Sequence, residues 1–181
     1  MTKERKIITL AAWRRPDYFN QVISSLRNAK NISDYTIICS IDGGYPEEQI
    51  KMYEILKSTK LNFNLTVHEE NLGCAENTRW VIEKGFSLAD KVIHLEDDTV
   101  VHPQFFEYMR ESLERYKDTK EVFTVSGYSN SNLPWHTEHW GGNNVGLRSW
   151  FTPWGWALWR RTWDELKDQW FGITFHDHTT F

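Results

Sequence analysis

Hydrophobic segments typical of strands alternate with amphipathic segments typical of helices through the first two thirds of the chain. The pattern predicts strands near 7–11, 35–41, 63–68, 92–95 and 122–126, and helices near 16–26, 46–57, 75–86 and 103–116. Strands that alternate with helices of this length favour a mostly parallel sheet covered on both faces and joined by right-handed crossovers. We therefore expect an α/β fold with three layers, α/β/α.

Polar and charged residues follow each of the first four predicted strands. Arg14 and Arg15 follow the first, Asp42 the second, Asn71 the third, and the run Glu96–Asp98 the fourth. The carboxyl ends of parallel strands meet at one edge of the sheet, where ligands bind in such folds. The sequence therefore predicts one binding site at this edge.

The acidic run Glu96–Asp98 directly follows a buried strand. Three adjacent carboxylates repel one another and lose hydration unless a cation compensates. Mg²⁺ and Mn²⁺ bind carboxylate oxygens together with phosphate oxygens, so the run predicts a metal-bound diphosphate. The alternative is a solvated turn before the next helix.

Composition limits the possible partners and compartments. The 181 residues suit a single domain, and the formal net charge of −4 gives no general attraction to nucleic acid, so no nucleic-acid partner is expected. No apolar run is long enough to span a bilayer, so we expect no integral membrane segment. Two cysteines imply no disulfide framework, which favours a reducing, cytoplasmic location.

From residue 129 the pattern changes to a segment rich in Asn, Gly, His and Trp. We interpret residues 1–128 as a nucleotide-binding half and 129–181 as a Trp-rich wall that contacts donor and acceptor, within one domain 1–181. A capping box of Thr162 and Glu165 predicts a short helix. Of the tryptophans, Trp159 and Trp163 suit a core, whereas Trp135 and Trp140 are candidates for stacking on acceptor sugars.

The motifs "LAAWRRP", "SIDGG", "ENLGCAENTRW", "HLEDDTVVHPQFFEYM" and "SWFTPWGWALWRRTWDEL" occur in this order. Together they resemble the glycosyltransferases of the GT-A fold, closest to the inverting N-acetylglucosaminyltransferases of N-glycan and O-mannosyl glycan synthesis and their bacterial relatives. The resemblance covers nearly the whole chain. It implies a Rossmann-like GT-A fold and a metal-dependent, inverting transfer of a sugar, with N-acetylglucosamine as the candidate, from a UDP-sugar to a glycan or other hydroxyl acceptor.

The resemblance also implies roles for individual residues. Asp98 would bind Mn²⁺ or Mg²⁺, and Glu96 and Asp97 would contact the sugar and ribose. The remaining donor contacts would come from Arg14 on uracil or phosphate, Asp42 on uracil, Asn77 in place of a family histidine, and Gly155 and Trp156 near the transferred sugar. Arg79 is a further nucleotide-binding candidate, with a solvated helix residue as its alternative.

Inverting transfer needs a general base to take the proton of the acceptor hydroxyl. By the resemblance Asp177 in "FHDHTTF" is this base, with Asp164 as second choice. The alternatives are a metal site formed by the flanking His176 and His178, or a tail without a role. Members of the family usually run on beyond this point, so we expect the chain to be a fragment or a minimal form.

Two other functions fit parts of the sequence. A sugar nucleotidyltransferase shares the α/β architecture, but it would carry a glycine-rich loop after the first strand, where "AAWRRP" has no glycine. A binding module that kept the fold and lost the base is the alternative outside enzymes. Walker, dinucleotide-binding, serine-nucleophile and zinc motifs are absent from the sequence.

Overall fold

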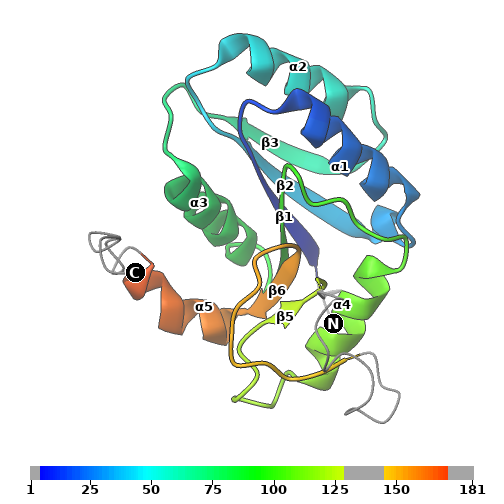
Figure 1. The fold of residues 1–181 in the computed structure, drawn as a ribbon, viewed down its shortest axis with the longest axis vertical. Helices are drawn as coiled ribbons and strands as arrows, with labels where there is room; N and C mark the ends of the chain where they lie inside the picture. Colours follow the sequence, from blue (N-terminus) through cyan, green and yellow to red (C-terminus); the bar gives the residue numbers. More distant parts are fainter. Residues whose placement is uncertain (1–4, 129–144, 171–181) are drawn as a thin grey trace, which may run out of the picture.

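The computed structural model describes residues 5–128 and 145–170, which form a six-stranded sheet with helices on both faces (Figure 1). The strand order is β3-β2-β1-β4-β6-β5. The first four strands pair in parallel, whereas β6 is antiparallel to both β4 and β5. The strands are β1 (Lys6–Ala12), β2 (Tyr35–Ile41), β3 (Phe63–Val67), β4 (Lys91–Glu96), β5 (Val125–Ser126) and β6 (Trp156–Trp159).

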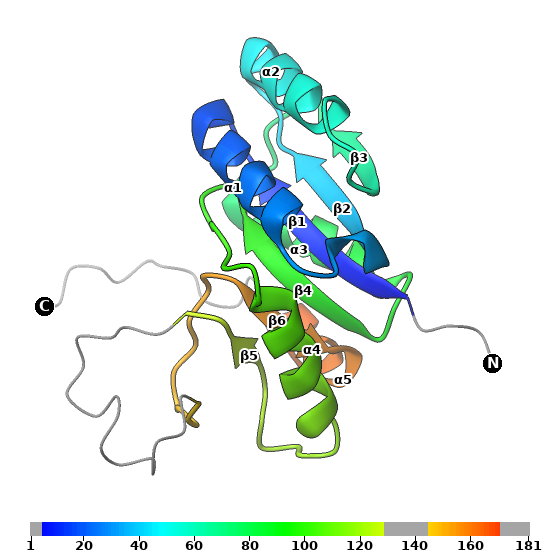
Figure 2. The same ribbon diagram turned by 90° about the vertical axis from the view of Figure 1, so that its right-hand side faces the viewer.

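Within the described residues, five helices make the two outer layers. They are α1 (Pro16–Asn28), α2 (Pro46–Lys57), α3 (Cys74–Phe86), α4 (Phe105–Arg115) and α5 (Arg160–Leu166), with short 3₁₀ turns at Ile32–Asp34 and Lys167–Gln169. Helices α1, α2 and α4 cover one face of the sheet, and α3 and α5 cover the other (Figures 1 and 2). The expected α/β fold with a mostly parallel sheet is confirmed.

Each helix packs through an apolar stripe that its sequence spacing predicts. In α1, Phe19, Val22, Ile23 and Leu26 recur at the helical period and are all buried. Pro16 and Pro46 stand in the first turns of α1 and α2, where a missing backbone N–H costs nothing. Among the described residues, no helix combines the length and apolarity that a membrane span needs.

Part of the Trp-rich segment enters the sheet as β6, although the sequence pattern predicted no strand after residue 126. Strand β6 lies between β4 and β5, with His94 opposite Trp156 and Lys91 opposite Trp159. Trp159 and Trp163 are buried, as expected for core residues.

The predicted capping box is wrong. Helix α5 begins at Arg160 after Trp159, and Thr162 lies inside the helix, where its hydroxyl donates to the Phe123 carbonyl at 2.8 Å. The fifth strand is also shorter than expected, covering only Val125–Ser126.

The parallel strands end at nearly one level. Ala12 at the end of β1 is opposite Ile41 at the end of β2, and Ala11 is opposite Glu96 at the end of β4. Ile41 is opposite Val67 at the end of β3. The loops after these four strands therefore start side by side, as a site at this edge requires.

Candidate active site at the carboxyl edge of the sheet

A pocket of about 200 Å³ opens at the ends of β1, β2 and β4 and at the start of α3. Residues from all the predicted strand-end loops line it: Ala11, Ala12, Trp13, Arg15, Asp42, Asn71, Gly73, Cys74, Asn77, Thr78, Glu96 and Asp97. The pocket thus unites groups far apart in sequence.

Asp97 is the most firmly held acid of the site. One carboxylate oxygen, Oδ2, accepts the Trp13 backbone N–H at 2.8 Å, and the other accepts an Arg15 guanidinium N–H. Only 3% of the Asp97 side chain is exposed. Burial raises the pKa of Asp97, while the Trp13 N–H and Arg15 act in the opposite direction. The contacts of both oxygens hold the loop after β4 against the turn after β1.

Arg15 also pairs with the last acid of the run. Its Nη1 lies 3.0 Å from Asp98 Oδ2, so one guanidinium bridges Asp97 and Asp98. Burial would lower the pKa of Arg15, but the two carboxylates outweigh it and the pKa is raised. The Asp98 side chain stays about one third exposed, at 34%.

Glu96 lines the pocket, and its neighbours shift its pKa. Burial raises the pKa of Glu96, and the negative charges of Asp98 and Asp97 raise it further, with Arg15 opposing them. The Cys74 thiol lines the same pocket, and burial followed by the Glu96 charge raises its pKa. A cation bound beside Glu96, Asp97 and Asp98 would relieve the repulsion among their carboxylates.

Asp42 is a buried acceptor for the neighbouring loop. Its Oδ1 accepts the backbone N–H groups of Gly43 at 2.9 Å and Leu72 at 2.8 Å, and its Oδ2 accepts that of Gly73 at 3.0 Å. The residue is 2% exposed. Two carboxylate oxygens offer about four lone-pair sites, so roughly one remains for a ligand in the pocket that Asp42 lines.

Asn77 occupies the floor of the pocket on α3. Its Oδ1 accepts the Ser40 hydroxyl, and its Nδ2 donates to the Ala12 carbonyl at 3.4 Å. Ser40 Oγ lies in turn 3.0 Å from His68 Nε2. The amide therefore ties α3 to the ends of β1 and β2, and it is 3% exposed.

The two other predicted arginines do not line this pocket. The Arg14 guanidinium lies 4.1 Å from the centre of the Trp13 ring and donates to the Tyr45 hydroxyl at 3.2 Å. Arg79 pairs with Glu83 one turn along α3 at 3.1 Å. Arg14 flanks the pocket beside Trp13, whereas Arg79 is placed as a surface helix residue would be.

Gly155 and Trp156 lie behind the acidic loop. Gly155 has a φ of +66°, and a Cβ there would approach Thr99 and Phe105 to 3.3 and 3.1 Å. The Trp156 ring is 2% exposed and packs edge-on against His94. Neither residue lines the 200 Å³ pocket, because the Trp156 backbone pairs with β4 and β5 and the Gly155 carbonyl accepts the Gly127 N–H at 2.8 Å.

Three predicted residues, Asp177, Trp135 and Trp140, lie outside the described residues. The second-choice base, Asp164, is exposed on α5, pairs with Lys167 at 2.7 Å and does not line this pocket. The roles of all four stay predictions.

The carboxylates at this site suit a metal ion that binds together with a phosphate ligand. Within 5–128 and 145–170, no group of three or more His, Cys, Asp or Glu side chains is placed to hold an ion. Mg²⁺ is usually held by one or two carboxylates together with substrate phosphates, which the partly exposed Asp98 can satisfy.

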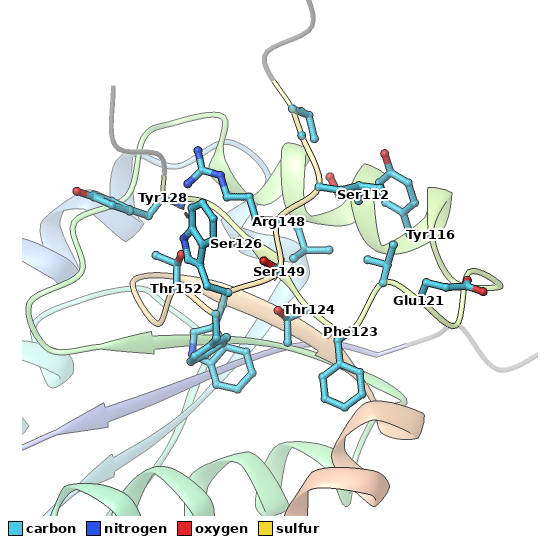
Figure 3. Close-up of a pocket in the computed structure, with 18 of the residues that line it drawn as sticks. Ser112, Tyr116, Glu121, Phe123, Thr124, Ser126, Tyr128, Arg148, Ser149 and Thr152 are labelled. Atoms are coloured by element: carbon cyan, nitrogen blue, oxygen red, sulfur yellow. Dashed lines mark hydrogen bonds between the residues drawn. The ribbon is translucent and has the colours of Figure 1, made fainter. Parts of the chain in front are cut away.

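A second and larger pocket of about 670 Å³ lies along β5, between α4 and the segment 145–152 (Figure 3). Its lining includes aromatic residues such as Tyr128, Trp150 and Phe151 beside polar groups such as Arg148 and Thr152. In Figure 3, Tyr128, Arg148 and Thr152 are among the side chains drawn around this pocket. Among the described residues the two pockets share no lining side chain.

Sequence reasoning assigned no contact to several pocket residues. Arg15 was expected at the sheet edge, but its bridge between Asp97 and Asp98 was not. Cys74 and Thr78 were not assigned to the site, although their position at the start of the third helix, after "ENLG", was a usable signal. Trp13 was missed because a tryptophan after a strand is most simply a packing residue.

Comparison with known proteins identifies the relatives of this arrangement. A sequence profile described as the GNT-I family matches residues 6–179. The chain belongs to the GNT-I family. It is also 24% identical over 186 aligned residues to the alpha-1,3-mannosyl-glycoprotein 2-beta-N-acetylglucosaminyltransferase of Arabidopsis thaliana. The match covers 90% of this chain but 39% of that relative, so the chain spans about two fifths of its length.

Solved structures share the fold. The mannosyltransferase PcManGT from Pyrobaculum calidifontis, determined with GDP-Man and Mn²⁺, superposes with a TM-score of 0.67 at 10% identity, covering 91% of this chain and 47% of that one. Residues 1–349 of S. aureus TarS in complex with UDP-GlcNAc give a TM-score of 0.60 at 13% identity, covering 91% and 47%. The expected GT-A fold is therefore confirmed. This GNT-I family chain is a homologue of glycosyltransferases.

Proposed function

We propose that this GNT-I family chain binds a UDP-sugar and forms the donor-binding part of a metal-assisted, inverting glycosyltransferase. The transferred sugar is N-acetylglucosamine or a related hexose, and the acceptor is a glycan or another hydroxyl compound. Support comes from the family match, from the named activity of the Arabidopsis relative and from the UDP-GlcNAc complex of the structural neighbour.

One observation carries the proposal. Four loops that are separate in sequence bring Arg15, Asp42, Asn71, Glu96 and Asp97 to a single pocket at the carboxyl edge of the sheet. In open α/β sheets this edge is where nucleotides bind. The convergence of these side chains adds an observation of site geometry to the family match.

The size of the pocket indicates which part of a nucleotide it holds. Pockets that enclose a whole drug-sized ligand are about 300 Å³ or larger, whereas this one has about 200 Å³. We assign it to the base and part of the ribose, between the Trp13 side and the Asp42 and Asn77 floor. The diphosphate would then lie over the loop of Glu96, Asp97 and Asp98.

The charges at that loop suit a diphosphate only when cations accompany it. Arg15 offers guanidinium N–H donors, which form bidentate bonds with phosphates. Asp98 would hold Mn²⁺ or Mg²⁺, which would neutralise charge on the leaving diphosphate. Glu96 lines the pocket and, with its raised pKa, would accept or donate a hydrogen bond at the ribose or sugar.

Asp177 is proposed as the general base that takes the acceptor proton, and Gly155 with Trp156 as the segment beside the transferred sugar. A cytoplasmic location is also proposed, and it is supported by Cys39 and Cys74, which are both unpaired thiols.

The test is calorimetric titration of the full chain with UDP, with and without Mn²⁺. We expect Mn²⁺ to tighten UDP binding in the native chain and to have no such effect in Asp98→Ala. Asp118→Ala, which removes a carboxylate from an exposed position, is the matched control. Equal UDP affinity in Asp98→Ala and the native chain, at every Mn²⁺ concentration, would overturn the metal assignment.

Release of UDP from UDP-GlcNAc, with and without glycan acceptors, tests the chemistry. Binding without any turnover would favour a nucleotide-sugar binding module. Failure of UDP to bind under all conditions would refute the proposed donor site.

A further inference from the structure

Arg15 is the cation that neutralises the acidic loop in this structure. Its guanidinium bonds Asp97 Oδ1 through Nη2 and lies 3.0 Å from Asp98 Oδ2 through Nη1. Asp98 is the partly exposed member of the pair, and the Arg15 side chain is 43% exposed. The carboxylate proposed to take a metal thus already has a positive charge beside it.

The backbone is arranged to bring Arg15 to this place. Arg14 has a φ of +42°, in the left-handed region that non-glycine residues rarely adopt. The turn sends Arg14 over the Trp13 ring and Arg15 toward the acids. Asp97 fixes both sides of the turn, because it accepts the Trp13 N–H as well as the Arg15 guanidinium. Strain held in place by such contacts is typical of functional positions.

We propose that Arg15 makes metal binding depend on the nucleotide. The inference rests on the proposed function, because it concerns the same donor site. A divalent ion that binds Asp98 alone meets the positive charge of Arg15 and must share or take its carboxylate. A diphosphate brings negative charge that both cations can bind at once, so it removes this penalty.

The coupling is reciprocal. If UDP strengthens Mn²⁺ binding through Arg15, then Mn²⁺ strengthens UDP binding by the same factor. A guanidinium suits this role because its planar fork can hold two carboxylates, or one carboxylate and one phosphate oxygen, without losing its charge. Arg15 is therefore a positioning residue that couples the binding of the two ligands.

The first experiment measures Mn²⁺ alone, by electron paramagnetic resonance of the free ion, on the full chain. Arg15→Gln is expected to bind Mn²⁺ about tenfold more tightly than the native chain, the effect of one unit charge on a divalent ion roughly 6 Å away in water. Arg14→Gln is the matched control. It makes the same charge change at the adjacent residue, whose side chain contacts Trp13 and Tyr45 instead of the acids. We expect the control to stay within about threefold of the native chain, since more distant exposed charges are screened.

The second experiment repeats the Mn²⁺ titration with saturating UDP. UDP should raise the Mn²⁺ affinity of the native chain, and the factor should fall by roughly tenfold in Arg15→Gln, as the lost charge requires. Arg15→Lys keeps the charge but loses the fork, and its affinity for Mn²⁺ alone should stay near the native value.

Several results would overturn the inference. They are an unchanged or weaker affinity of Arg15→Gln for Mn²⁺ alone, an equal gain in Arg14→Gln, and an Arg15→Lys variant that behaves like Arg15→Gln. If UDP fails to bind the native chain at all, the proposed function falls, whereas an Arg15 effect on Mn²⁺ alone would still be seen or refuted.

A measurement on the native chain covers the case in which Arg15→Gln does not fold. The Arg15 Nε–H resonance should move when Mg²⁺ and UDP are added together and should stay in place with Mg²⁺ alone. A full shift with Mg²⁺ alone would contradict the coupling.

Discussion

Replacing Asp42 by Asn should destabilise the protein strongly, although the side chain stays the same size. The Asp42 carboxylate accepts three backbone N–H groups, from Gly43, Leu72 and Gly73, at 2.8–3.0 Å. An amide has one oxygen, so it can keep the two bonds at Oδ1 only as weaker neutral bonds. Its NH₂ group then faces the Gly73 N–H, donor against donor.

The magnitude follows from these contacts. A hydrogen bond to a charged group contributes about 1.5–3 kcal/mol and a neutral one about 1 kcal/mol. Weakening two bonds by about 0.5–2 kcal/mol each and losing the third would remove roughly 3–7 kcal/mol from the free energy of unfolding. Asn71 Oδ1, which already accepts the Gly73 N–H at 2.7 Å, replaces part of the third bond, so we expect a loss near the lower end, about 3 kcal/mol. Against a typical total of about 5–15 kcal/mol this is a large fraction.

The assay is urea unfolding followed by tryptophan fluorescence. We expect the midpoint of Asp42→Asn to fall with an unchanged slope, which marks a loss of stability alone. Asp118→Asn makes the same chemical change at an exposed position and should stay within about 0.5 kcal/mol of the native chain. A loss below about 1 kcal/mol in Asp42→Asn would refute the reasoning, because it would mean that the buried carboxylate does not hold the loop.

Two further predictions concern a buried histidine and the proposed base. Burial lowers the pKa of His94 to about 3, so below its ordinary pKa of 6.5 the unfolded chain binds a proton that the folded chain excludes, and stability falls as the pH drops through this range. His94→Phe should therefore gain about 2 kcal/mol relative to the native chain between pH 7 and pH 5 in urea unfolding, and parallel pH profiles would contradict the assignment. Asp177→Asn should keep UDP affinity and lower UDP release in the presence of acceptor by about a hundredfold or more. A fully active variant would point to Asp164 or to a base outside this chain.

The sheet and its functional edge could be predicted because simple rules govern them. The alternation of strands and helices predicted the parallel part of the sheet, and the rule for the carboxyl ends of strands predicted that Asp42, Asn71 and Glu96 share one site. Strand β6 escaped prediction because its four residues are all buried and therefore show no alternation of apolar and polar side chains. Thr162 matched a local capping pattern, but its hydroxyl bonds Phe123, a partner that no local pattern reveals.

The different positions of the Arg14 and Arg15 side chains could not be predicted from the sequence. The two residues are chemically identical and adjacent, so composition and spacing assign them equally well to a phosphate site. A single left-handed φ at Arg14 separates them, directing one to aromatic rings and the other to carboxylates 82 and more residues away. Only the backbone geometry decides which charge belongs to the acidic loop.

The four acids at the site fall into two pairs, one that supports the structure of the pocket and one that is available to a ligand. Asp42 and Asp97 are almost fully buried and have their oxygens occupied by backbone N–H groups or by Arg15. Glu96 and Asp98 keep partly exposed carboxyl groups. Substitutions at the first pair should therefore change stability and nucleotide binding together, whereas those at the second pair should change binding while the unfolding midpoint stays near the native value. If all four positions affected binding alone, the buried acids would be ligands and not the supports that their hydrogen bonds indicate.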